Sequence, residues 1–323
     1  MYRRLERFWR LISPYRLDAG RGGTVSGNSA DRSVDVSKCR NRLKRIPPPP
    51  ALGRAAPTLG RRSSRASPRA RRPSPYHRAM PEIAPDTEGI ERVLVVVAHP
   101  DDCDFGCAAT TARWTDAGIH VSYCIVTDGQ AGGFDRAVPR ERMAEIRRGE
   151  QTAAAAVVGV SDIAFLGYPD GELTVTHELR RDITRVIRQR RPDRVVTQSP
   201  ERSWTRLFAS HPDHLAAAEA AICAVYPDSR NPFAHRELLE REGLEPHTVR
   251  ELWMMGNAER VNVWSDVTAT ADRKLEALRC HRSQYPEWEP LEERVRSWLR
   301  TSAENAGLGT GSSAEGFYRI ATA

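Results

Sequence analysis

Two short segments gather the residue types that metal-assisted acid–base chemistry needs. His-Pro-Asp-Asp at 99–102 and His-Pro-Asp-His at 211–214 together supply three imidazoles and three carboxylates. Two histidines and one carboxylate are ligands typical of catalytic zinc sites, in which one coordination position stays open for water. The same ligands also suit Fe(II). The two segments therefore predict a metal-dependent hydrolytic site.

The spacing within each segment suggests which residues bind the metal and which transfer protons. In an irregular loop, His99 and Asp102 can turn to one side and bind the metal, while Asp101 points elsewhere. A free carboxylate there can take a proton from a water whose pKa a zinc ion lowers to about 7. In the second segment, one of His211 and His214 can bind the metal, and the other can donate a proton or stabilise an oxyanion.

A plainer interpretation treats each segment as turn chemistry. Proline fixes φ, and aspartate commonly caps the helix that follows a turn. Asp213, for example, could simply cap a helix that begins near Leu215. Two such segments, each following an apolar strand-like run, favour the metal site over two unrelated turns.

The rest of this region alternates short apolar runs with helical periods. Strands are expected at 92–98, 120–127, 163–167, 194–198 and 251–255, and helices at 107–118, 140–158 and 215–226. A further helix is marked by apolar residues from Leu179 to Ile187 and is expected to stop before Pro192. Strand–helix alternation without internal repeats predicts an α/β fold with a mostly parallel sheet flanked by helices. Ligands of such sheets bind beyond the carboxyl ends of the strands, which is where both segments fall.

The order and context of the two segments make the chain resemble the PIG-L/LmbE-like family of zinc-dependent de-N-acetylases. The resemblance runs from about residue 93 to residue 320. It also rests on TDGQAGG at 127–133, RRGEQTAAAAVVGVSDIAFLGYPDGEL at 147–173, HRSQ at 281–284 and AEGFYRI at 314–320. It implies a Rossmann-like α/β fold and a hydrolase that removes acetyl from an N-acetylated amino sugar, a glycoconjugate or a related linear amide.

The resemblance also implies roles for the first segment. His99, Asp102 and His214 would hold zinc, with Fe(II) as the alternative, and Asp101 would be the general base. One position departs from the family, which usually has Glu where this chain has Cys103. That cysteine could pack in the core or approach the metal as a soft ligand. It is also the one feature that favours an alternative function, a catalytically silent sugar- or metal-binding protein.

Further roles follow from the same resemblance. His211 would stabilise the oxyanion and protonate the leaving amine, and Asp213 would orient His211. Arg147 matches an arginine that reaches substrate in the family, although a solvated helical arginine is an equally simple interpretation. Asp170 could be a turn residue or accept a hydrogen bond from a sugar hydroxyl. Asp128 ends a predicted strand, where it could line the pocket.

Charge divides the 323-residue chain into two parts. Residues 1–79 hold 20 Lys and Arg against 4 Asp and Glu, a net charge of +16, whereas residues 80–323 carry −9. An acidic body argues against a dedicated nucleic-acid-binding domain, which needs a basic face. We expect a disordered tail rich in Arg and Pro over residues 1–87 and one deacetylase domain over residues 88–323.

The tail and the cysteines bear on where the protein works. The tail could be a transit peptide, a basic arm for nucleic acid or anionic lipid, or sequence upstream of a natural start at Met80. The sequence has no run of about 18 consecutive apolar residues, so it predicts no membrane-spanning helix. Six cysteines without a CxxC pair predict reduced thiols and therefore a cytoplasmic enzyme.

Overall fold

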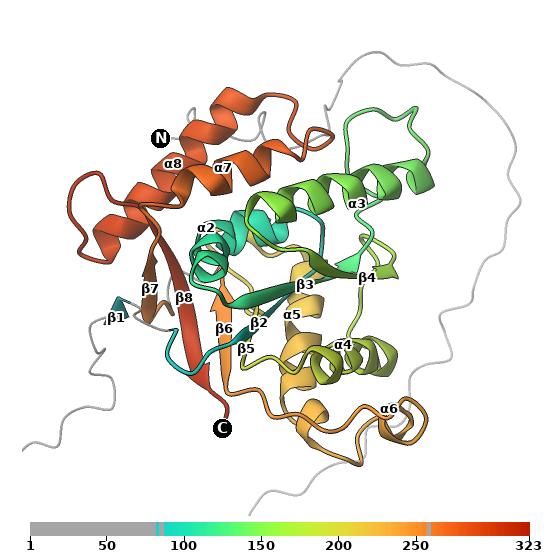
Figure 1. Cartoon of the computed structure of the whole chain (residues 1–323). Coiled ribbons are helices and arrows are strands. Elements are labelled where there is room, and N and C mark those ends of the chain that lie inside the picture. Colours follow the sequence, from blue (N-terminus) through green and yellow to red (C-terminus); the bar gives the residue numbers. More distant parts are fainter. Residues whose placement is uncertain (1–81, 84–86, 257–259) are drawn as a thin grey trace, which may run out of the picture. The chain divides into compact units, whose positions relative to one another are not determined.

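The computed structural model describes residues 82–83, 87–256 and 260–323, whose helices and strands are shown in Figure 1. The strands are β1 (Glu82–Ile83), β2 (Arg92–Val97), β3 (His120–Thr127), β4 (Asp162–Tyr168), β5 (Arg194–Gln198), β6 (Glu251–Met255), β7 (Val263–Asp266) and β8 (Ala314–Ala321). The α-helices are α2 (Asp102–Asp116), α3 (Arg140–Val157), α4 (His177–Arg190), α5 (Pro212–Val225), α6 (Arg236–Glu240), α7 (Ala271–Arg279) and α8 (Trp288–Asn305). Two short 3-10 helices are η2 (Leu207–Ala209) and η3 (Asp228–Arg230).

These strands form one sheet in the order β1-β7-β8-β6-β5-β2-β3-β4. Strands β6, β5, β2, β3 and β4 pair in parallel, and β8 runs antiparallel to both β6 and β7. The expected α/β fold with a mostly parallel sheet is confirmed. Because β2 and β5 are neighbours, the loops that follow them open at the same edge of the sheet.

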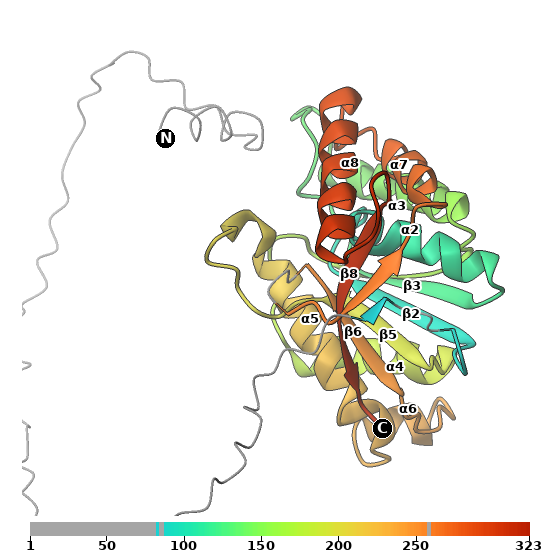
Figure 2. The ribbon, with the colours of Figure 1, turned by 90° about the vertical axis from the view of Figure 1, so that its left-hand side faces the viewer.

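Helices cover both faces of the sheet, as Figures 1 and 2 show together. Helices α2, α3, α7 and α8 lie on one face, and α4, α5 and α6 lie on the other. In β2, Val93, Val95 and Val97 pack on the face covered by α2 and α3, while Leu94 and Val96 pack on the face covered by α4 and α5. Burial on both faces explains why this strand reads as an unbroken apolar run.

The five predicted strands and four predicted helices all form, with two informative differences at helix starts. Helix α5 begins at Pro212 instead of Leu215, because His211 and not Asp213 is its N-cap residue. Helix α2 begins at Asp102 instead of Cys107, and it is kinked at Cys107, where φ is −150° and ψ is 16°. The turn ahead of that kink was not visible in the apolar periodicity.

Two residues of the segment predicted to be a tail belong to the sheet. Glu82 and Ile83 form β1 and pair in parallel with Val263 and Trp264 of β7. The rest of the predicted tail lies outside the described residues, apart from residue 87. Within the described part of the chain, no helix has both the length and the apolar character needed to span a membrane.

Candidate active site

The two His-Pro-Asp segments meet at the carboxyl-terminal edge of the sheet. Nδ1 of His99 lies 3.4 Å from Oδ2 of Asp102 and 3.2 Å from Nε2 of His214. Nε2 of His214 lies 3.1 Å from Oδ1 of Asp102. Ligand atoms on one face of a tetrahedral zinc site, with bonds of 2.0–2.1 Å, are about 3.3 Å apart. The two nitrogens and the Asp102 carboxylate, which faces one nitrogen with each oxygen, are therefore close enough together to hold a metal ion. His99 also forms possible metal-binding groups with His211 and His214, and with Asp170 and Asp213.

The second nitrogen of His99 faces two further carboxylates. Nε2 lies 3.1 Å from Oδ1 of Asp170 and 3.2 Å from Oδ2 of Asp213. A proton on Nε2 leaves the lone pair of Nδ1 free, which is the arrangement typical of a metal-binding histidine oriented by a carboxylate. Burial lowers the pKa of His99, but its contacts with Asp102, Asp170 and Asp213 outweigh burial and raise it well above its ordinary value. The cluster favours positive charge at its centre, which a divalent cation also supplies.

Asp213 differs from its expected role. Its carboxylate accepts hydrogen bonds from the backbone N–H groups of Gly171 and Leu173, at 2.7 and 3.3 Å, as well as contacting His99. Toward His211 it offers only its backbone N–H, which donates to Nδ1 at 3.2 Å. The fully buried Asp213 carboxylate thus contacts His99, makes no direct hydrogen bond with the His211 ring, and does not cap α5.

His211 stands at the edge of this cluster. Its ring lies edge-on to that of His99, with centroids 4.9 Å apart, and 5.4 Å from that of His214. Because Nδ1 accepts a backbone hydrogen bond, a proton on the neutral ring sits on Nε2. Burial lowers the pKa of His211, and the neighbouring His99 and His214 lower it further. The lowered pKa makes the imidazolium form of His211 a stronger acid than that of an ordinary histidine.

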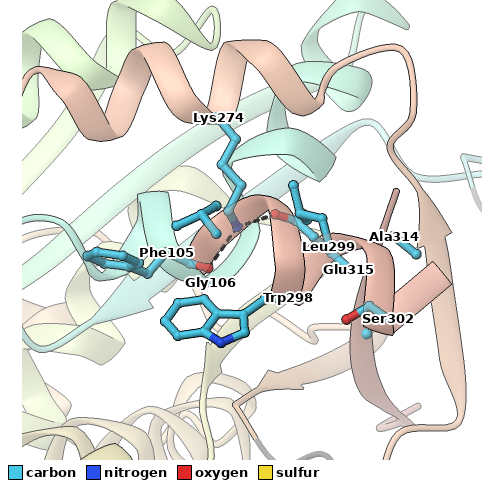
Figure 3. A pocket seen from close by; sticks show the side chains of 10 residues that line it. Phe105, Gly106, Lys274, Trp298, Leu299, Ser302, Ala314 and Glu315 are labelled. Carbon is cyan, nitrogen blue, oxygen red and sulfur yellow. Dashed lines mark hydrogen bonds and ion pairs between the residues drawn. The ribbon is translucent and has the colours of Figure 1, made fainter. Parts of the chain in front are cut away.

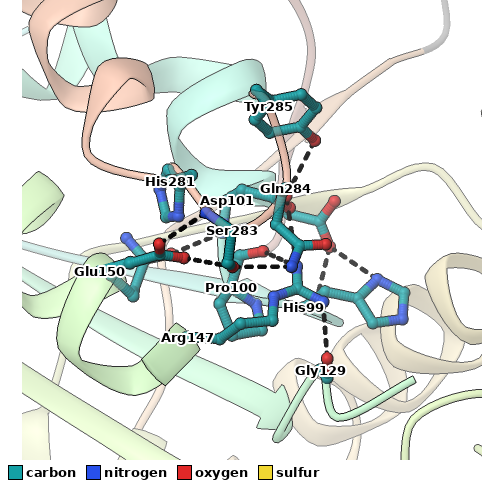
Figure 4. A network of polar contacts seen from close by, with 12 residues as sticks. His99, Pro100, Asp101, Gly129, Arg147, Glu150, His281, Ser283, Gln284 and Tyr285 are labelled. Carbon is teal, nitrogen blue, oxygen red and sulfur yellow. Dashed lines mark hydrogen bonds and ion pairs between the residues drawn. The ribbon is translucent and has the colours of Figure 1, made fainter. Parts of the chain in front are cut away.

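Asp101 is buried and held in an unusual backbone conformation. Its φ is 93°, in the left-handed region that strains a residue with a side chain, and such strain gathers at functional sites. Its backbone N–H donates to Gln151, and its Oδ2 accepts from Arg147 at 3.2 Å and from the Tyr285 hydroxyl at 2.9 Å (Figure 4). Burial raises the pKa of this carboxyl, and Asp102 adds to the rise, whereas Arg147 opposes it. A raised pKa suits a general base.

Arg147 lies buried under the loops of the site, and is not the solvated arginine that one interpretation expected. Its guanidinium donates to the carbonyl groups of Gly129 and Pro100, at 2.8 and 2.6 Å, and to the Asp101 carboxylate. A Cβ at Gly129, where φ is 63°, would lie 2.5 Å from this guanidinium. The glycine-rich segment therefore gives Arg147 room to tie two loops to the base.

The two other predicted substrate-binding residues have protein partners. Asp170 contacts His99 and accepts from the backbone N–H of Ala131 at 3.0 Å. Asp128 accepts two hydrogen bonds from Arg148, at 3.0 and 2.5 Å. Asp170 thus belongs to the histidine cluster, whereas Asp128 is engaged by a neighbouring helix.

Sequence reasoning missed the segment over residues 281–285 as part of the site. It packs across α2 and α3: His281 Nε2 lies 2.8 Å from the Asp104 carboxylate, and Ser283 donates to Glu150 at 2.7 Å. These contacts bring Tyr285 onto Asp101. The HRSQ motif was the available signal, but nothing in the sequence connected it to this pocket.

Cys103 packs in the protein core and does not lie among the candidate metal ligands. Its side chain is fully buried in the apolar layer between the sheet and helices α2 and α3. Burial raises the pKa of its thiol well above the ordinary value, which keeps it protonated. The residue that favoured a silent binding protein therefore leaves the cluster of histidines and aspartates intact.

Comparisons with known proteins agree with this site. The family model described as "PIG-L: GlcNAc-PI de-N-acetylase" matches residues 94–225. Diacetylchitobiose deacetylase of Thermococcus kodakarensis is 35% identical over 66% of this chain and 77% of its own length. "Probable N-acetyl-alpha-D-glucosaminyl L-malate deacetylase 2" of Bacillus cereus is 34% identical over 59% and 83%. The structure of N,N'-diacetylchitobiose deacetylase from Pyrococcus horikoshii, with its inhibitor MPG, matches with a TM-score of 0.67 and 32% identity over 73% and 86%. The chain therefore belongs to the PIG-L/LmbE-like family of de-N-acetylases and is a deacetylase.

Proposed function

We propose that the chain hydrolyses the N-acetyl group of an N-acetylglucosamine-containing sugar at a zinc ion held by His99, Asp102 and His214. The observation that carries the proposal is that His99 Nδ1 and His214 Nε2 lie 3.2 Å apart and each lies within 3.4 Å of one oxygen of Asp102, with the buried Asp101 beside it in the chain. Fe(II) is the other metal that this ligand set suits.

Asp101 would act as the general base. When bound, the metal would lower the pKa of a water molecule and polarise the amide carbonyl. Arg147 and Tyr285 both bind Oδ2 of Asp101, so Oδ1 is the oxygen that would accept the proton of the attacking water. The raised pKa of the carboxyl makes it a better proton acceptor than an exposed aspartate.

His211 would complete the reaction. Its Nε2–H would donate a hydrogen bond to the developing oxyanion. The imidazolium form of His211 would pass its Nε2 proton to the amine nitrogen as the C–N bond breaks, which returns the ring to its neutral form. Asp101 holds the proton taken from water and would restore the imidazolium, so that amide and water yield acetate and free amine. The depressed pKa of the ring favours release of that proton.

The substrate class follows from the relatives. Their names specify diacetylchitobiose and an N-acetylglucosaminyl malate, both of which carry the 2-acetamido group. We propose that the substrate is a glycoconjugate with that group and that the enzyme acts in the reducing environment of the cytoplasm. The described cysteines are all free thiols, which supports that setting.

Acetate release tests the proposal. The full chain, purified without chelator, is assayed on N-acetylglucosamine, diacetylchitobiose and N-acetylglucosaminyl conjugates, with the isosteric Asp101→Asn beside it. We expect Asp101→Asn to lose about 10²–10⁴-fold in kcat, which is the usual contribution of a general base. Asp116→Asn, at an exposed ion pair with Arg273, is the matched control. Wild-type turnover in Asp101→Asn would reject the base, and no acetate from any substrate would reject the reaction.

A further inference from the structure

Helix α2 is broken one turn after it begins. At Cys107 the backbone leaves the helical region, with φ at −150° and ψ at 16°. The short piece ahead of the break, residues 102–106, starts with Asp102 and directly follows Asp101. Its direction therefore fixes where the proposed base and one metal ligand point.

Two charged side chains from distant parts of the chain bind this break. Nζ of Lys274, on α7, donates to the Phe105 carbonyl at 2.7 Å and to Oε1 of Glu315, on β8, at 2.5 Å. Oε2 of Glu315 accepts from the backbone N–H of Thr110 at 2.8 Å. Figure 3 shows Lys274 between the Phe105 carbonyl and Glu315. One side chain thus binds backbone before the break, and the other binds backbone after it.

The pair is buried and joins three elements. Lys274 and Glu315 each have side chains only 4% exposed. In an uninterrupted α-helix, the carbonyl of Phe105 would accept a hydrogen bond from the N–H of residue 109, and the N–H of Thr110 would donate to the carbonyl of residue 106. The ion pair serves both groups from outside, so it holds the two pieces of α2 at a fixed angle.

The first turn of α2 is confined on one side and has space on the other. A Cβ at Gly106 would lie 2.1 Å from Sδ of Met255, so the turn rests directly on β6. Beside the ion pair lies a cavity of about 110 Å³, lined by Phe105 and Gly106 from this turn and by Trp298 and Leu299 of α8. Without Lys274 and Glu315, the turn has room to shift toward that cavity.

We propose that Lys274 and Glu315 are positioning residues for the deacetylase site, acting through the first turn of α2 on Asp101 and Asp102. The inference rests on the proposed function, which assigns those two aspartates. If the ion pair merely stabilises the fold, removing it would lower the melting temperature and leave the metal site unchanged. The two cases are therefore separable by measuring metal binding.

The test removes both charges together. Lys274→Met/Glu315→Gln leaves neither charge buried alone, and the glutamine keeps an acceptor for Thr110. We expect metal affinity, measured by competition with a chelator, to fall about tenfold, as it does when groups that orient ligands are lost. The d–d spectrum of the Co(II)-substituted protein should change, and kcat should fall with little change in KM, because Asp101 acts in the chemical step.

A second, partly buried ion pair provides the control. Arg180 on α4 and Asp228 on η3 lie 2.7 Å apart on the other face of the sheet. Arg180→Met/Asp228→Asn should lower the melting temperature and leave metal affinity, the Co(II) spectrum and kcat at their wild-type values. This control measures what losing a structural ion pair does by itself.

Glu315→Asp keeps the inference falsifiable if the double variant does not fold. It keeps the charge but shortens the side chain, so that the carboxylate cannot reach both Lys274 and Thr110. Weaker metal binding and lower kcat in this variant would support the positioning role of Lys274 and Glu315. Wild-type metal affinity, Co(II) spectrum and kcat in a folded variant of either kind would overturn it. A wild-type chain that binds no metal would contradict the proposed function instead.

Discussion

The Asp213 carboxylate lies 3.2 Å from Nε2 of His99, so the two nitrogens of that ring face different partners. Asp213 and Asp170 bind Nε2, while Nδ1 faces Asp102 and His214. The carboxylate of the His-Pro-Asp-His segment thus contacts the histidine of the first segment. This contact links α5 to the loop after β2.

Removing that charge should weaken metal binding. In Asp213→Asn the amide oxygen can still accept from Gly171, but the anionic partner of His99 is gone. We expect metal affinity to fall about 10–100-fold, as is typical when the carboxylate behind a ligand histidine is lost. Chelator competition measures this, with Asp182→Asn on α4 as the control. Equal affinities in the two variants would show that Asp213 does not orient the ligand.

The hydroxyl of Tyr285 should matter to the rate. Tyr285→Phe removes one of the two hydrogen bonds to Oδ2 of Asp101. A hydrogen bond to a charged group contributes about 1.5–3 kcal/mol, so we expect kcat to fall about 10–100-fold. Tyr168→Phe is the matched control, because its hydroxyl donates to Asp182 at 2.8 Å on α4. Steady-state kinetics showing the same kcat for both variants would refute this role of Tyr285.

Two glycines with similar backbone angles separate strain from collision. Gly129 and Gly243 have φ of 63° and 67°, but only at Gly129 would a Cβ meet another side chain, that of Arg147. Both alanine variants should lose about 1 kcal/mol or more of stability through left-handed strain. Only Gly129→Ala should also lose activity, because it displaces Arg147 from Asp101. If chemical denaturation and kinetics show full activity in a destabilised Gly129→Ala, Arg147 is not needed at that position.

His247 should make stability depend on pH. Its Nε2–H donates to the Pro192 carbonyl at 2.8 Å, and burial lowers its pKa in the folded state. The unfolded chain then takes up a proton at a higher pH than the folded one, so the stabilisation is present above the unfolded pKa, about 6.5, and is lost as pH falls. The difference in unfolding free energy between wild type and His247→Gln should therefore shrink from pH 8 to pH 5. A difference that grows with acid would mean the ring is charged when folded.

The parallel sheet and the meeting of the two segments could be predicted because they depend on local patterns. Buried strands such as β2 read as apolar runs, and the topology of parallel sheets brings their following loops to one edge. The kink at Cys107 could not be predicted, because Lys274 and Glu315 bind it from far along the chain. The partner of Asp213 also depended on how the loop at Asp170 approaches His99, which no spacing within the segments encodes.

Metal content tests the central claim most directly. The full chain, His214→Ala and Asp101→Asn are purified without chelator and measured by elemental analysis, beside acetate release from diacetylchitobiose. We predict one zinc per chain in wild type and in Asp101→Asn, far less in His214→Ala, and acetate from wild type alone. Undiminished metal in His214→Ala, or a wild-type chain that binds none after reconstitution, would contradict the assignment of His99, Asp102 and His214 as the metal site.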